Sequence, residues 1–136
     1  MDLDAAREVL RHQHHAVLAT MKPDGTPQLS PVLIGVDAAG HAIVSSRETS
    51  YKVRNLRRDP RVYVAVLPDR FFGRWIQITG TAELVSLPDA LEPLVDYYRR
   101  VAGEHSNWAD YREAMRLERR VLVRVTLTGA GPDKHG

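Results

Sequence analysis

The sequence predicts a mainly β protein, in which six antiparallel strands curl into a barrel and two or three short helices are inserted between them. Short segments with alternating apolar and polar residues predict the strands, and turns rich in Pro, Gly and Asp separate them. A helical period appears only in short stretches. The 136 residues are of single-domain size, so we expect one domain over residues 1–136, with a loose tail at about 129–136.

The N-terminal part predicts a short helix followed by a β-hairpin. Asp2 or Asp4 can cap the helix, and strands over residues 15–21 and 26–36 flank a Lys-Pro-Asp-Gly turn. Pro31 lies inside the second strand and has no N–H for a sheet ladder. That strand must therefore run along an edge, bulge, or end its pairing near Pro31.

The rest of the chain alternates between strand and helix patterns. Thr49 or Ser50 can cap a helix that Asp59-Pro60 stops, because the residue before proline disfavours helical geometry. Gly80 predicts a bulge or bend in its strand. The remaining elements are strands over 41–46, 61–67, 74–85 and 120–128, a helix from Pro88 to about Gly103, and a second helix capped by Asn107.

Composition excludes several functional classes. The chain has no cysteine, which excludes disulfides, thiolate metal sites and a cysteine nucleophile. No apolar run approaches the roughly 18 residues of a membrane span, and the acidic N-terminus lacks a secretory signal pattern. We therefore expect a cytoplasmic location and no membrane partner. His12, His14 and His15 do not share a helix face and lack further ligands, so we expect no metal site.

Positive charge is concentrated in one stretch. Residues 47–61 hold six basic residues against two acidic ones, whereas the whole chain has a net charge of +2. This pattern fits either an anionic partner held at one place or an ordinary solvated helix face. A nucleic-acid partner is not expected, because the strands carry no run of exposed aromatic residues for base stacking.

The same region contains a candidate anion site where a strand ends and a helix begins. Free N–H groups at a helix start favour anions, and hydroxyl and cationic side chains can add hydrogen bonds and charge. The alternative is a capped helix with solvated basic residues. The candidate residues are Ser45, Ser46, Arg47, Thr49, Ser50 and Lys52.

Three motifs then carry a family resemblance. They are PQLSPV (27–32), SYKVRNLRRDPRV (50–62) and AGEHSNWADYREAM (102–115). With the order of elements, they resemble the flavin/deazaflavin split-barrel family, which is pyridoxamine 5'-phosphate oxidase-like, and more narrowly its actinobacterial reductases that use coenzyme F420. The resemblance implies an FMN-binding split β-barrel, and a homodimer with the cofactor near its interface.

The resemblance also implies roles for individual residues. Lys52 matches a lysine that contacts the cofactor phosphate, and Ser45, with Ser46 beside it, matches a strand-end hydroxyl. The other matches are Gln28, Ser30 and Val32 along the deazaflavin ring, Asn55 one helical turn from Lys52, and Trp75, an aromatic position that the dimer partner contributes in the family.

One departure bears on the choice of cofactor. Ser50 stands where related F420 binders often carry an arginine, so Arg47 is a candidate replacement. A single lysine at the phosphate, with Arg54, Arg57 and Arg58 spread along the helix, favours the phosphodiester of F420 over the phosphate dianion of FMN.

The resulting expectation is an oxidoreductase that transfers a hydride from reduced F420 to an unsaturated small-molecule acceptor. The alternatives are an FMN-dependent enzyme like pyridoxamine-phosphate oxidase and a non-catalytic F420-binding or storage protein. The sequence identifies no catalytic side chain.

Overall fold

The chain folds around one seven-stranded antiparallel sheet with the strand order β2-β1-β5-β6-β7-β4-β3, and the computed structural model describes residues 1–136. The elements are α1 (Leu3–Leu10), β1 (His15–Met21), β2 (Pro27–Leu33), β3 (Gly35–Val36), β4 (Ala42–Arg47), α2 (Tyr51–Arg58), β5 (Arg61–Leu67), β6 (Arg74–Val85), α3 (Leu91–Ala102), α4 (Trp108–Leu117) and β7 (Arg120–His135). The mainly β split barrel with short helices is confirmed. None of the helices is long and apolar enough to cross a membrane.

Closure of the sheet depends on Ile34. This residue alone separates β2 from β3, which stand at opposite ends of the strand order, so the sheet must curl until its two edges meet. Ile34 is fully buried, and its N–H donates to the His14 carbonyl at 2.8 Å. The strand expected over 26–36 is therefore two strands, which gives seven rather than six. Pro31 lies on the edge strand β2, as its missing N–H requires.

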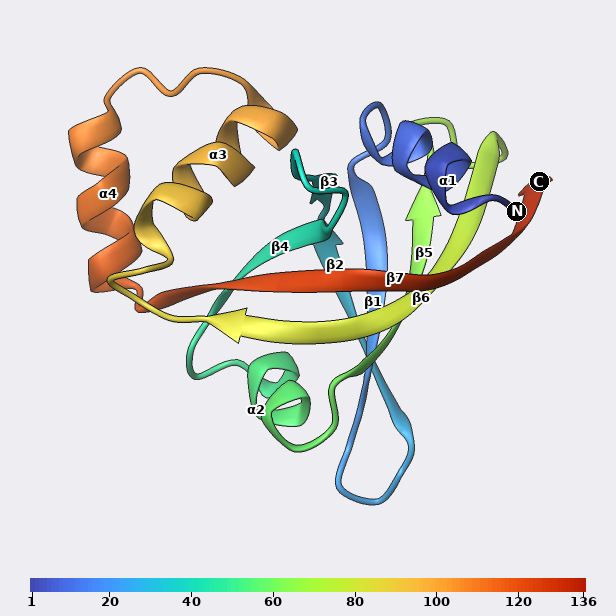
Figure 1. Cartoon of the computed structure of the whole chain (residues 1–136), viewed down its shortest axis with the longest axis horizontal. Coiled ribbons are helices and arrows are strands. Elements are labelled where there is room, and N and C mark those ends of the chain that lie inside the picture. The colour runs from blue at the N-terminus through green and yellow to red at the C-terminus, as the bar shows by residue number, and fades with distance from the viewer.

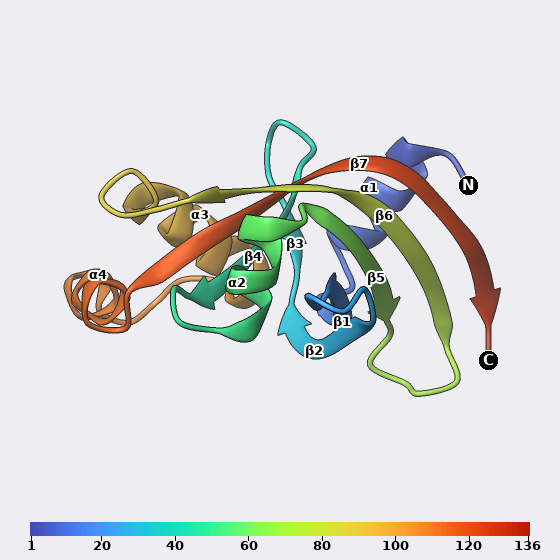
Figure 2. The same ribbon diagram turned by 90° about the horizontal axis from the view of Figure 1, so that it is seen from below.

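The two longest strands, β6 and β7, run side by side across the molecule (Figure 2). The prediction of a loose tail at 129–136 is wrong, because residues up to His135 extend β7 and pair with the start of β6. Arg74 and Asp133 fix this end through a bidentate ion pair at 2.8 and 2.9 Å. The predicted irregularity at Gly80 is confirmed by a register shift between Thr79 and Gly80.

The helices α3 and α4 pack together at one end of the β6–β7 ribbon, and the two chain termini lie at the other end (Figure 1). Apolar residues of both helices form a second core with β4 and β7, separate from the core inside the barrel. The Tyr111 hydroxyl donates to the Leu94 carbonyl at 2.7 Å and ties α4 to α3. These helices therefore form a wall beside the end of β4.

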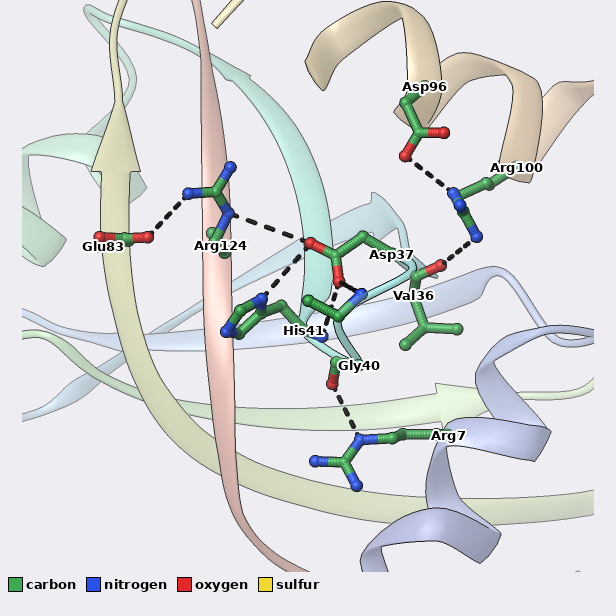
Figure 3. Close-up of polar contacts among 10 residues, drawn as sticks. Arg7, Val36, Asp37, Gly40, His41, Glu83, Asp96, Arg100 and Arg124 are labelled. Carbon is green, nitrogen blue, oxygen red and sulfur yellow. Dashed lines mark hydrogen bonds and ion pairs between the residues drawn. The ribbon is translucent and has the colours of Figure 1, made fainter.

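Polar contacts hold the turn between β3 and β4 (Figure 3). Asp37 accepts backbone N–H bonds from Ala39 at 3.0 Å and His41 at 2.9 Å. From outside the turn, Arg7 donates to the Gly40 carbonyl at 2.9 Å and Arg100 donates to the Val36 carbonyl at 3.1 Å. Helices α1 and α3 thus both brace the start of β4, the strand that leads to the candidate anion site.

Gly80→Ala should destabilise the protein. A Cβ at this position would lie 2.3 Å from the Thr126 carbonyl oxygen on β7, so the two central strands would have to separate. We expect the free energy of unfolding to fall by about 1–3 kcal/mol, measured by urea denaturation. Thr81→Ala, at the exposed neighbouring position, is the control. Equal stability of the Gly80→Ala variant and the wild type would contradict this close approach.

Candidate functional site

A cavity of about 630 Å³ lies between the end of β2, the strand β4, the first turn of α2 and the α3–α4 wall. Its size falls within the range usual for small-molecule and cofactor sites. Its lining combines apolar, aromatic and charged side chains: Pro31, Val32, Leu33, Ser45, Lys52, Tyr97, Tyr98, His105, Asp110, Tyr111, Ala114, Met115, Glu118 and Arg120.

Lys52 enters the cavity from the first turn of α2. Ser50 begins this helix, since its hydroxyl accepts the Val53 N–H at 3.2 Å. Burial lowers the pKa of Lys52 below its usual 10.5, and the nearby positive charge of Arg120 lowers it further. No carboxylate offsets these two effects. Lys52 is therefore a half-buried cation without an anionic partner in the protein.

Arg120 reaches the same cavity from the start of β7. The pairing of β4 with β7 sets Arg120 opposite Arg47, next to the strand end that precedes Lys52. The Arg120 guanidinium donates twice to Glu118 Oε1, at 2.8 and 3.0 Å. These hydrogen bonds hold the pKa of Glu118 below its usual value, so Glu118 is a carboxylate at neutral pH.

Aromatic side chains form the α3–α4 side of the cavity. The Tyr97 hydroxyl donates to the Leu33 carbonyl at 2.8 Å and joins α3 to the end of β2. Burial raises the pKa of Tyr97, and it raises the pKa of Tyr111 to about 12. Both phenols are therefore neutral at physiological pH and add no negative charge to the cavity.

His105 belongs to an aromatic cluster with Tyr98, Trp108 and Tyr111, whose ring centroids lie 5.0–5.8 Å apart. The backbone N–H of Asn107 donates to His105 Nδ1 at 2.9 Å. In its neutral form this ring therefore carries its proton on Nε2. His105 therefore packs against Trp108 and also lines the cavity.

Three of the residues selected from the sequence line this cavity together: Val32, Ser45 and Lys52. Ser46 and Ser50 do not line it. Their hydroxyl oxygens lie 2.9 Å apart in a hydrogen bond, and Ser50 also caps α2. These two serines therefore shape the helix start.

Arg47 is 59% exposed, with its guanidinium 3.2 Å from Glu118. The cation that stands beside Lys52 is thus Arg120, and Arg47 does not line the cavity. Two arginines of the basic stretch that follows also have partners within the protein. Arg57 pairs with Glu48, and Arg58 donates to the Met21 carbonyl at 2.6 Å.

Gln28, Ser30 and Val32 share one face of β2, where half-buried positions alternate with exposed ones. Gln28 contacts Asn55 on α2, because the Asn55 amide donates to Gln28 Oε1 and to Thr20 Oγ1, both at 3.0 Å. Asn55 is buried, at 4% exposure. Its side chain fastens α2 to the β1–β2 hairpin, and its contact with a cofactor stays a prediction, as does that of Ser30.

Trp75 lies at the start of β6, away from α3 and α4, which follow the end of that strand. It does not line its own chain's cavity. It alternates with the buried Ile76 and therefore faces the outer side of the sheet. A contribution of Trp75 to the cavity of a partner subunit stays a prediction.

The sequence did not reveal Tyr97, His105, Glu118 and Arg120 as parts of one site. The available signal was the Glu-Arg-Arg run before the last strand, but only the pairing of β7 with β4 brings it beside Lys52.

Comparisons with known proteins agree with this architecture. The family model described as pyridoxamine 5'-phosphate oxidase matches residues 3–131. A conserved hypothetical protein from Mycobacterium tuberculosis is 28% identical, with a TM-score of 0.77 over 96% of this chain and 82% of that one. A protein described as an F420 reductase is 24% identical, with a TM-score of 0.71 over 92% and 94%. The heme storage protein HutZ from Vibrio cholerae is 18% identical, with a TM-score of 0.73 over 100% and 98%.

Proposed function

Because the chain belongs to the pyridoxamine 5'-phosphate oxidase family, we propose that it is an oxidoreductase that binds F420 in this cavity and reduces an unsaturated small molecule. The observation that carries the proposal is Lys52, a half-buried cation with no carboxylate partner in a cavity of cofactor size. An anionic ligand would reduce the repulsion between Lys52 and Arg120, which Glu118 offsets only in part.

The donor set of the cavity fits a phosphate-bearing, ring-containing cofactor. Lys52 and Arg120 supply cationic donors and Ser45 supplies a hydroxyl. Val32, Leu33 and the aromatic side chains of α3 and α4 supply apolar surface for a ring. This separation of a charged part from an apolar part matches the division of F420 or FMN into a phosphate and a planar ring.

F420 is favoured over FMN by the balance of charge around Lys52. The carboxylate of Glu118 lies against Arg120 at 2.8 Å, so the two cations at this end of the cavity are partly offset. A phosphodiester has one negative charge, whereas a terminal phosphate has about 1.5 to 2 near neutral pH. FMN remains the alternative cofactor, and a non-catalytic F420-binding protein remains the alternative function.

When bound, reduced F420 supplies a hydride, and the chain's own residues supply position and electrostatics. Tyr97 holds α3 against the end of β2 and so keeps the cavity wall in place. The neutral form of His105 offers an Nε2 hydrogen to a carbonyl or similar acceptor. We assign no acid catalyst.

We also propose that two copies of the chain associate through the outer face of β1, β2 and β5. This face exposes three large apolar side chains: Leu29 is 66% exposed, Leu33 43% and Tyr63 37%. Leu33 also lines the cavity, so a partner on this face would help to close the site. Trp75 faces the same side of the sheet and would then lie near the partner's cofactor.

Lys52→Gln should weaken binding of F420 by about tenfold to a hundredfold, because a charge-assisted hydrogen bond is lost. Titration followed by tryptophan fluorescence measures the affinity, and Lys22→Gln, at an exposed turn position, is the control.

Wild-type affinity should fall as pH rises through the lowered pKa of Lys52, whereas Lys52→Arg should stay charged and keep its affinity. Unchanged affinity in Lys52→Gln would refute the assignment.

Turnover separates the enzyme from the storage protein. Reduced F420 should be oxidised in the presence of a quinone, an enone or a tetrapyrrole, which absorbance at the deazaflavin band follows. Tight binding with no turnover across such a panel would favour storage.

Size-exclusion chromatography with light scattering tests the association. The wild type should be a dimer at micromolar concentration, and Leu29→Lys should be a monomer because it places a charge on the apolar face. Leu117→Lys is the matched control, since Leu117 is 75% exposed and lies on α4, outside β1, β2 and β5. A monomeric wild type would end the proposal.

A further inference from the structure

The turn between α4 and β7 places Arg120 near Lys52 and holds Glu118 against Arg120. Glu118 is the C-cap of α4, and Arg120 is the first residue of β7. Between them, Arg119 has a φ of 52°, in the left-handed region that non-glycine residues rarely adopt. This backbone conformation carries an energetic cost. The same turn brings the Arg120 guanidinium back onto the Glu118 carboxylate.

The Arg120 guanidinium acts on the pKa of three other cavity side chains. Its positive charge lowers the pKa of Lys52, and it opposes the rise in pKa that burial causes at Tyr97 and Tyr111. All four residues line the cavity. The guanidinium therefore lies among cavity residues, and its side chain is only 25% exposed.

Glu118 gives this end of the cavity a defined charge. Lys52, Arg120 and Glu118 together carry one net positive charge. Arg47 also contacts Glu118, but from the solvent side, where it is 59% exposed and screened. Asp110 lies eight positions before Glu118 on α4 and its C-cap, about 12 Å along the helix axis, so its charge acts weakly here.

We propose that Arg120 is the second phosphate ligand of the site and that Glu118, by holding Arg120 and cancelling one positive charge, selects a phosphodiester over a phosphate monoester. The inference rests on the proposed function, because it takes the cofactor phosphate as the ligand of Lys52. Arg120 thereby takes the role of the arginine that related F420 binders often carry at the position of Ser50. Glu118 in turn becomes a specificity-determining residue. The second negative charge of a phosphate monoester would be repelled by the Glu118 carboxylate, and no further cation would balance it.

The test is a titration of three ligands: F420, FMN and riboflavin, which has the ring of FMN without its phosphate. Arg120→Gln should weaken F420 and FMN by at least tenfold and leave riboflavin unchanged, and Arg120→Lys should recover part of the loss. Glu118→Gln keeps an oxygen acceptor for Arg120 but removes the charge. Glu118→Gln should therefore increase the affinity for FMN about tenfold more than the affinity for F420.

The chain offers matched controls for both variants. Arg124 lies on the same strand, is 28% exposed and pairs with Glu83 at 2.9 Å. Glu113 lies on α4 and pairs with Arg116 at 3.5 Å. Arg124→Gln and Glu113→Gln should leave all three affinities at wild-type levels, because neither residue lines the cavity.

A measurement without ligand checks the geometry separately. Arg120→Gln should raise the pKa of Lys52, because it removes the nearby positive charge, and a carbon-detected NMR titration of the lysine side chains follows this shift. An unchanged Lys52 pKa would contradict the placement of Arg120.

The outcomes separate this inference from the proposed function. A wild type that binds neither F420 nor FMN overturns both. A wild type that binds, with Arg120→Gln at full affinity or Glu118→Gln with an unchanged preference between F420 and FMN, overturns the inference alone.

Discussion

The pairing of β4 with β7 is the contact on which the rest of the structure depends. It joins residues 42–47 to residues 120–125 in one antiparallel ladder, and so connects the early hairpins to the end of the chain. Lys52 follows β4 by one short turn, and Arg120 begins β7. The same ladder supports the second core, in which Ile43 and Leu122 pack with α3 and α4. The closure of the fold, the position of the α3–α4 wall and the proximity of Lys52 and Arg120 therefore all depend on the β4–β7 pairing.

The electrostatics of the cavity follow from that pairing. Two cations lie in a partly buried space, where burial, and then the positive charge of Arg120, lowers the pKa of Lys52. Such an arrangement costs stability in the free protein and gains it when an anion binds. The tyrosines beside it keep their protons, so they preserve this positive character. The cavity thus combines positive charge with the apolar and aromatic surface of β2, α3 and α4.

Local patterns predicted most of the fold. The alternation in β5 and β6, the proline-glycine turn before β2 and the serine at the start of α2 all act over a few residues. The paths of β2 and β7 were harder to predict, because the break at Ile34 and the continuation of β7 to His135 depend on partners far along the chain. The Arg74–Asp133 ion pair joins residues 59 positions apart.

The cavity residues selected from the sequence lie on β2, β4 and α2, and none lies on α3, α4 or β7. Lys52, Ser45 and Val32 line the cavity together, and their contact with a cofactor stays a prediction. Arg47 was the expected second cation, but its side chain is 59% exposed and its guanidinium lies 3.2 Å from Glu118. Ser46, Ser50 and Asn55 are occupied by hydrogen bonds within the protein. Arg120 could not be found from the sequence, because its neighbour in space lies 68 positions earlier in the chain.

A crystal structure of the wild-type protein with F420 bound would test the central claim most directly. We expect the phosphodiester to lie within hydrogen-bond distance of Lys52 Nζ, with the ring along β2 near Val32. A cofactor bound away from the cavity, or bound there with its phosphodiester remote from Lys52, would contradict it.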